Sequence, residues 1–275
     1  MAVIRPFPAV RPRPENVAAV AAVPYDVVSR EEAAQLAAGN PLSFLHVSRS
    51  EIDLEPGIDP YSDAVYARAQ ANYARLKQEG VLLQEQEGSL YVYRLRSGDH
   101  SQMGLAATFA VDEYDGGKIL KHEKTRKDKE DDRTRHILTL RAQTGPVLLT
   151  FRPMAAIREL FEEATRGQPL YDLAASDGIQ HTVWRVSACD RWVQAFEKVP
   201  SLYIADGHHR AAGASRARAH LREESSSWTG QEAANFFLAV AFPTDQLRIL
   251  PYDRVVKDLN GLTAHQLREK LHPYV

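Results

Sequence analysis

The chain has 275 residues, 44% of them hydrophobic and 25% charged, which is typical of a folded globular protein and excludes disorder as its main state. Its 34 Lys and Arg against 36 Asp and Glu leave a net charge of -2, which argues against a dedicated DNA- or RNA-binding protein. The single cysteine, Cys189, excludes an internal disulfide, and neither a membrane-length apolar run nor a signal peptide is visible, so we expect a cytoplasmic protein with no membrane partner.

Residues 1–100 predict an N-terminal α+β region. Prolines before residue 15 predict an extended start, and residues 17–23 predict a short strand that runs into a turn. Ser29 and Glu32 have the spacing of a capping box, which predicts a helix through Leu36. Further elements of this region are a strand at 44–47 and a helix from Asp59 with the apolar stripe Tyr61, Val65, Ala69, Tyr73 and Leu76. A hairpin of strands 90–95 and 104–111 crosses into the next region.

Residues 101–275 predict a second α+β region. Its polar stretch 118–136 becomes helical by Asp131 and ends at Gly145. The other expected elements are strands at 147–151, 179–186, 201–205, 236–242 and 247–250, and helices at 155–165, 190–198 and 210–222. Because strands and helices do not alternate strictly, an α+β fold with a mixed β-sheet and surrounding helices is favoured over a doubly wound fold. Thr263 opens a last helix near the end, so we expect the chain to be a fragment of a longer protein.

The sharpest motif is Asp206-Gly207-His208-His209-Arg210, which lies between an apolar strand and an Ala-rich helix. The first N–H groups of a helix lack intrahelical partners, and the helix dipole favours negative charge there, so this turn predicts an anion site. Asp206 is a candidate ligand for magnesium or a partner for a hydroxyl. The structural alternative is a capped turn whose histidines face solvent.

A second motif is the stretch 121–133, in which both signs of charge are interleaved. One interpretation is a solvated helix with i,i+4 pairs such as Glu123–Lys127 and Asp131–Arg135. The functional interpretation is a mobile lid over a substrate, formed by phosphate-binding Lys124, Arg126 and Arg133 and by substrate-facing His122 and Glu123.

A third motif, Pro24-Tyr25-Asp26, sets a carboxylate just before the capped helix. It is either a simple helix entry or the source of a general base, with Asp26, Glu31 and Glu32 as the candidates. The chain has no G-x-x-x-x-G-K-[ST] phosphate loop and no G-x-G-x-x-G motif.

These motifs resemble the ParB/sulfiredoxin superfamily, whose phosphate-binding strand–turn–helix is similar to residues 203–210. More closely, the chain from residue 5 to about 261 resembles a large, mostly uncharacterised microbial family with a D-G-H-H-R motif. The segments that carry this resemblance are 6–12, 24–27, 122–125, 129–133, 206–210 and 251–254.

The D-G-H-x-R variant is similar to that of free-serine kinases, which phosphorylate L-serine with ATP or ADP and magnesium. The resemblance therefore implies a nucleotide-dependent small-molecule kinase with a small hydroxyl compound, foremost free L-serine, as acceptor. Sulfiredoxin chemistry is disfavoured because the motif lacks a cysteine. The implied catalytic residues are Asp26, His122, Glu123, Asp206 and His209, the phosphate-binding residues are Gly207, His208, Arg210, Lys124, Arg126 and Arg133, and the magnesium ligand is Asp206.

Two other functions remain open from the sequence. The first is a nucleotide-binding regulatory protein without turnover, in which a partner reads the charged lid. The second is a phosphoester hydrolase that uses the histidine pair. The sequence leaves the oligomeric state open.

Overall fold

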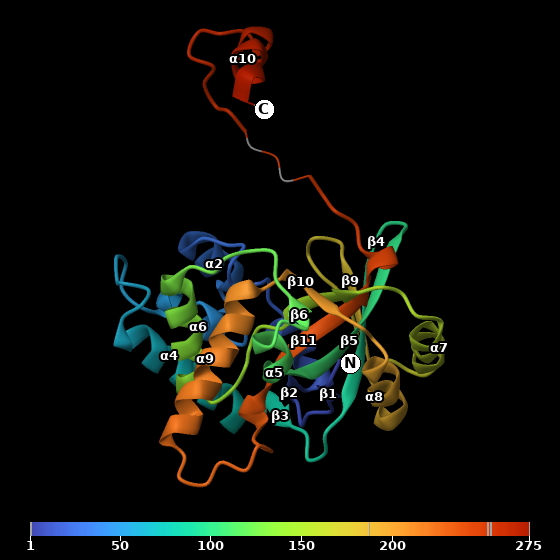
Figure 1. Cartoon of the computed structure of the whole chain (residues 1–275). Helices are drawn as coiled ribbons and strands as arrows, with labels where there is room; N and C mark the ends of the chain where they lie inside the picture. Colours follow the sequence, from blue (N-terminus) through green and yellow to red (C-terminus); the bar gives the residue numbers. More distant parts are fainter. Residues whose placement is uncertain (1, 187, 252, 254, 275) are drawn as a thin grey trace.

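Figure 1 shows the computed structural model of the chain, which describes residues 2–186, 188–251, 253 and 255–274. Strands are β1 (Ile4–Arg5), β2 (Val10–Pro12), β3 (Leu82–Gln84), β4 (Leu90–Ser97), β5 (His100–Ala110), β6 (Ile119–Leu120), β7 (Val147–Phe151), β8 (Tyr171–Ala174), β9 (Gln180–Val186), β10 (Leu202–Asp206) and β11 (Phe236–Pro243). Helices are α1 (Val17–Val20), α2 (Arg30–Ala37), α3 (Leu45–Ser48), α4 (Asp63–Gln78), α5 (Val111–Asp115), α6 (Lys127–Leu140), α7 (Ala155–Ala164), α8 (Cys189–Glu197), α9 (His208–Glu224) and α10 (Ala264–Leu271).

A large mixed sheet forms the centre of the molecule and confirms the predicted α+β class. Among the described residues its strand order is β6-β10-β7-β11-β5-β4-β9-β8, with β1 paired to the end of β5. The pairs β6–β10 and β7–β11 are parallel, and the other pairs are antiparallel. The predicted hairpin is formed by β4 and β5, which turn at Gly98 with a φ of 55°. The boundary expected at residue 100 falls at the first residue of β5, so both predicted regions contribute strands to the same sheet.

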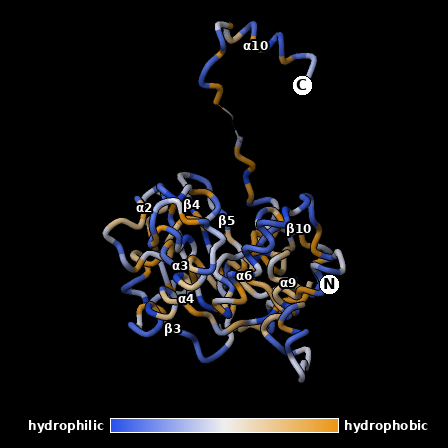
Figure 2. The backbone as a smooth tube through the Cα atoms, turned by 90° about the vertical axis from the view of Figure 1, so that its left-hand side faces the viewer, coloured by the Kyte–Doolittle hydropathy of each residue, from blue (hydrophilic) through white to orange (hydrophobic). Residues whose placement is uncertain are grey.

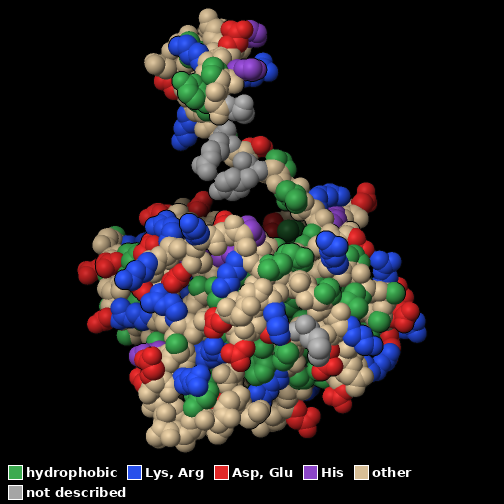
Figure 3. All heavy atoms as spheres, in the orientation of Figure 1, with side chains coloured by type: hydrophobic (Ala, Val, Ile, Leu, Met, Phe, Trp, Pro, Cys, Tyr) green, Lys and Arg blue, Asp and Glu red, His purple; other side chains and the backbone are tan. Residues whose placement is uncertain are grey.

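One face of the sheet carries the main hydrophobic core. Alternate residues of β7, namely Val147, Leu149 and Phe151, are buried, as expected when one face of a strand packs against helices. Side chains of α5, α7, α8 and α9 join this core, including Phe161 and Phe196. In Figure 2 α10 stands apart from this body. On the face drawn in Figure 3 both signs of charge are interspersed, in keeping with the small net charge.

A second, smaller cluster joins the N-terminal helices to α6. It includes Val20 of α1, Val47 of α3, Leu76 of α4 and Leu140 of α6. Helix α6 in turn packs closely on α9: a Cβ added to Gly213 would lie 2.8 Å from the Arg133 Cβ, so this contact requires a glycine. The α6–α9 pair therefore connects the N-terminal region to the sheet.

Two strands predicted near the N-terminus are wrong. Residues 17–20 form α1, and residues 45–48 form α3. Both are short apolar runs, which periodicity alone cannot assign to strand or helix. Val20 and Val47 pack in the same small hydrophobic cluster, and the Phe44 N–H donates to Val20 O at 3.1 Å. These residues therefore pair with one another and not with the sheet.

Other expectations hold with shifted boundaries. Helix α4 begins at Asp63 and not at Asp59, while α6 begins at Lys127 and ends at Leu140, where Arg141 has a left-handed φ of 51°. The strand predicted at 247–250 is wrong, since Ile249 is 98% exposed and these residues have no strand partner in the described part of the chain. The capped helices α2 and α10 are confirmed, with both capping boxes formed. Sequence reasoning missed these short elements: β1, β2, β3, β6, β8 and α5.

Candidate functional site

The two main motifs meet because the strands before them are parallel neighbours. Strand β10 runs beside β6 with Leu202 opposite Ile119, so both strands end at the same edge of the sheet. The loop after β6 carries residues 121–126, and the turn after β10 carries residues 206–210. Because β7 is antiparallel to β10, its beginning, preceded by Gly145 and Pro146, lies at this edge too.

Gly207 turns the chain from β10 into α9. Its φ of 92° is left-handed, a conformation that costs other residues free energy. An added Cβ would lie 3.0 Å from Arg210 Cζ and 3.3 Å from Val147 Cα, so the side chain of Arg210 passes directly over this glycine. Gly207 therefore meets both a backbone and a packing requirement at the start of α9.

Arg210 lies at the centre of the site, with its side chain 13% exposed. Its guanidinium donates to the carboxylate of Asp206 and to the carbonyl of Pro146. Asp26, from the loop before α2, places its Oδ2 3.5 Å from Arg210 Nη2. Two carboxylates from distant parts of the sequence thus converge on one guanidinium.

The histidine pair binds the charged loop. The N–H of His122 donates to His208 Nε2 at 3.4 Å, and the N–H of Arg126 donates to His209 Nε2 at 3.1 Å. Since Nε2 of His208 is the acceptor, the proton of a neutral ring lies on Nδ1, which is 3.5 Å from Glu123 Oε2. Burial and the nearby His122 ring lower the pKa of His208, which favours this neutral ring.

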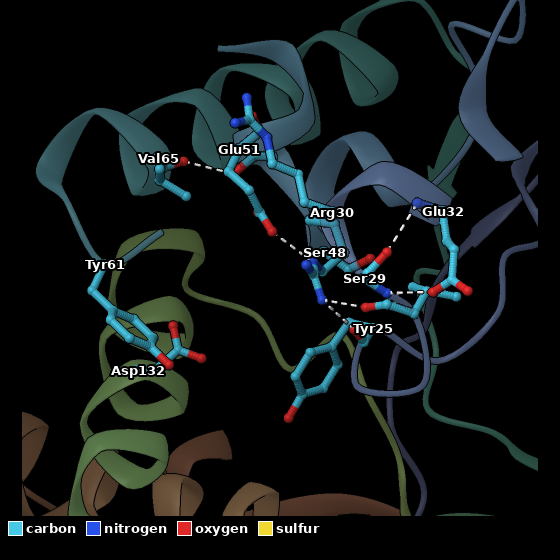
Figure 4. A network of polar contacts seen from close by, with 12 residues as sticks. Tyr25, Ser29, Arg30, Glu32, Ser48, Glu51, Tyr61, Val65 and Asp132 are labelled. Carbon is cyan, nitrogen blue, oxygen red and sulfur yellow. Dashed lines mark hydrogen bonds and ion pairs between the residues drawn. The ribbon is translucent and has the colours of Figure 1, made fainter. Parts of the chain in front are cut away.

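Tyr25 and Arg133 form the opposite wall of the site. The guanidinium of Arg133 stacks 4.0 Å from the centre of the Tyr25 ring, and its other contact is an ion pair with Asp132 at 2.6 Å. Burial raises the pKa of Tyr25, so its hydroxyl stays protonated. In Figure 4 the ring of Tyr25 points away from Ser29 and Glu32, which belong to the network that fixes this loop.

Arg49 is a positioning residue that sequence reasoning missed. Its Nη1 donates to Tyr25 O and to Val28 O, both at 2.8 Å, and its Nε donates to Glu51 at 2.6 Å. These bonds fix the loop that carries Asp26. No sequence pattern marks an arginine that binds carbonyls 21 and 24 residues away.

The other candidate bases are not in the cluster. Glu32 completes the capping box of α2, where the hydrogen bond from the Ser29 N–H lowers its pKa, and this makes it a weak base. Glu31 is exposed in the first turn of the same helix. Asp26 is the carboxylate of this segment that faces Arg210.

Three predicted phosphate ligands lie elsewhere or have other partners. Lys124 is exposed and forms no ion pair with a described residue, and Arg126 is 70% exposed and pairs with Asp128. Arg133 lines the site but pairs with Asp132. The predicted i,i+4 pairs Glu123–Lys127 and Asp131–Arg135 are also wrong. Asp131 pairs with Arg216 of α9, and Arg135 pairs with Asp63 of α4, because α6 is packed between these two helices.

The described residues contain no group of three or more metal-binding side chains. Asp26 and Asp206 are two carboxylates on one side of Arg210, which suits magnesium, since Mg²⁺ is often held by one or two carboxylates plus substrate phosphates. Across the part of the chain that the structure describes, every helix is too short or too polar to cross a bilayer.

Part of the resemblance noted above falls on the segment 251–254, where Tyr252 and Arg254 lie outside the described residues.

The comparisons with known proteins give a family. No curated protein matches the chain, and no solved structure matches it. One family matches residues 4–275, and its description is "Protein of unknown function (DUF1015)". Because the match spans almost the whole chain, the protein belongs to the DUF1015 family.

Proposed function

We propose that the protein is a nucleotide-dependent phosphotransferase that phosphorylates the hydroxyl of a small molecule, with free L-serine as acceptor and ATP or ADP as donor. The observation that carries the proposal is the convergence of Asp26, Asp206 and Arg210 at the N-terminus of α9. Phosphoryl transfer needs mainly positioning and charge neutralisation, and a helix N-terminus with an arginine and two carboxylates supplies both. The turn would then correspond to the phosphate-binding strand–turn–helix of the ParB/sulfiredoxin superfamily.

Each group has a distinct role in this proposal. The N–H groups at the start of α9 and the Arg210 guanidinium bind the transferred phosphate. Asp206 would hold magnesium, which would neutralise phosphate charge. Asp26 accepts the proton of the acceptor hydroxyl, while the oxygen of that hydroxyl bonds to phosphorus and the bond from phosphorus to the nucleotide breaks. His208 and His209 hold the loop that carries His122 and Glu123 over this point.

Hydrolysis through the histidine pair has less support. A histidine that acts as a base needs a free ring nitrogen near the reacting atom. Nε2 of His208 and Nε2 of His209 each accept a backbone N–H from the loop. The same contacts fit the regulatory alternative, a protein that holds its charged loop in place until a nucleotide binds.

A location in the cytoplasm stays a prediction.

The test is turnover by the Arg210→Ala variant. Purified protein is incubated with magnesium, ATP or ADP, and L-serine, and O-phosphoserine is measured. We expect the variant to lose roughly 10²–10³ of the rate or more, because a charged donor to the transferred phosphate is gone. Arg222→Ala, in the last turn of the same helix and exposed, is the matched control and should retain full activity. Equal rates for Arg210→Ala and the wild type would refute the proposal, and nucleotide binding without product would favour the regulatory function.

A further inference from the structure

A small pocket opens beside Arg210. Arg210, Arg133 and Tyr25 form its walls, and Ile137, Val147 and Leu238 supply apolar surface. Its enclosed space is much smaller than a nucleotide, so the pocket suits only a compact ligand with a few carbon atoms.

The charges around the pocket favour an anion. Two arginines line it, and no Asp or Glu is among its lining residues. His136, which also lines it, is neutral near pH 7 because burial lowers its pKa to about 4. Three carboxylates pair with these arginines from outside the lining, Asp132 with Arg133 and both Asp26 and Asp206 with Arg210, so a ligand in the pocket meets the donors that these pairs leave over.

Arg133 is fixed in place with donors left over. Its Nε and Nη2 bind Asp132 at 2.8 and 2.6 Å, while Nη1 has no hydrogen-bond partner among the described residues. Its side chain is 11% exposed, stacks on Tyr25, and has its Cβ against Gly213. A guanidinium held in this way loses little freedom when it binds a carboxylate, and its planar fork matches one.

The neighbouring side chains complete a site for such a ligand. Thr144 lines the pocket, and its hydroxyl has no hydrogen-bond partner in the described part of the chain. Gln143 is rigid, because its amide donates to Phe236 O at 2.8 Å and accepts from Leu238 N at 2.7 Å. The Asp26 carboxylate lies 3.5 Å from Nη2 of Arg210, which lines the pocket.

We propose that this pocket binds the acceptor of the reaction through a carboxylate: a small hydroxy acid or hydroxy amino acid whose carboxylate is held by Arg133 and Thr144. This inference rests on the proposed function, and it assigns Arg133 to the acceptor and not to the phosphates. The carbon atoms of the ligand contact Ile137, Val147 and Leu238, and its hydroxyl points toward Asp26. An alcohol of the same size without a carboxylate lacks a partner for Arg133 and binds weakly.

The test measures binding in the absence of nucleotide. The probes are L-serine and D-glycerate, with serinol and glycerol as matched compounds without a carboxylate. We expect the two carboxylates to raise the melting temperature of the wild type and to give heat in titration calorimetry, while serinol and glycerol do not. If neither carboxylate binds, or if serinol and glycerol bind equally well, the proposal is wrong.

Variants then locate the site. We expect Arg133→Gln to weaken carboxylate binding about 10- to 100-fold, since it removes a charged hydrogen bond, and Arg133→Lys to lie in between because it keeps only the charge. Thr144→Val is a milder second variant that tests the pocket if Arg133→Gln fails to fold. Arg135→Gln is the matched control on the same helix, because Arg135 pairs with Asp63 outside the pocket. Unchanged affinity in folded Arg133→Gln would overturn the assignment.

The inference and the proposed function can fail separately. Carboxylate binding that depends on Arg133, without product from magnesium and nucleotide, would retain the pocket and refute the kinase. Product formation with an unchanged acceptor KM in Arg133→Gln would retain the kinase and refute the pocket.

Discussion

Gly207 shows how much a single residue can determine at this site. Its backbone has a φ of 92°, and an added Cβ would lie only 3.0 Å from Cζ of the Arg210 guanidinium. The Asp-Gly pair was recognisable in the sequence because a turn from strand to helix favours glycine. The reason for glycine that the sequence could not show is the close approach of Arg210, which depends on Asp206, Pro146 and Asp26.

We predict that Gly207→Ala lowers the free energy of unfolding by more than the roughly 1–2 kcal/mol expected for a left-handed backbone alone. Gly230→Ala is the matched control, because Gly230 has a φ of 86° and no atom within 4 Å of the added Cβ. The difference between the two variants in urea denaturation measures the clash with Arg210. Equal losses would show that Arg210 moves aside without cost.

At the scale of elements, sequence reasoning succeeded where one local signal decides the structure. The bounds of β7 agree with the prediction, and both the Ser29 capping box and the Thr263 cap marked real helix starts. It failed for α1 and α3, whose short apolar runs fit either strand or helix and are decided by their packing partners. It also could not bring Asp26 to Arg210, since that contact follows from sheet pairing and from the loop that Arg49 holds.

Helix α6 carries a pH-dependent contact with α3. His136 is buried, its Nε2 lies 3.2 Å from Val47 O, and burial lowers its pKa to about 4 from an ordinary value of 6.5. The unfolded chain therefore binds this proton more readily than the folded one. The stabilisation from the neutral ring is complete above about pH 6.5 and is lost as the pH falls toward 4.

We predict that the stability of the wild type falls between pH 6.5 and 4 by up to roughly 3 kcal/mol from this residue, at about 1.36 kcal/mol per pKa unit. His136→Gln has no proton to gain and should show a flatter dependence over the same range, although it is less stable at pH 7. Urea denaturation of both proteins at several pH values measures the two slopes. Parallel curves would place the pH dependence in other groups.

At the scale of the whole molecule, the sheet joins parts that the sequence separates. Strand β1 near the N-terminus pairs with β5, and β5 lies between β4 and β11. The residues after Gln246 contribute little to this body, since Ile249, Leu250 and Val255 are 71–98% exposed. Figure 1 shows α10 at the end of this extended segment, away from the sheet.

We predict that a chain ending at Gln246 has a free energy of unfolding within about 0.5 kcal/mol of that of the full chain, which is the range expected when exposed residues are changed. Gln246 itself must stay, because its side-chain oxygen accepts from Met103 N at 2.7 Å. The Gln246→Ala variant of the full chain is the comparison and should lose more stability than the truncation. A large loss on truncation would mean that the segment packs against the body in solution.

The projecting α10 also offers a practical handle. A biotin or a sensor-chip linkage attached through this helix would keep the support away from the sheet and the helices that pack on it. Weak small-ligand affinities, which are hard to detect when immobilisation masks part of a protein, thereby become accessible to surface-based instruments.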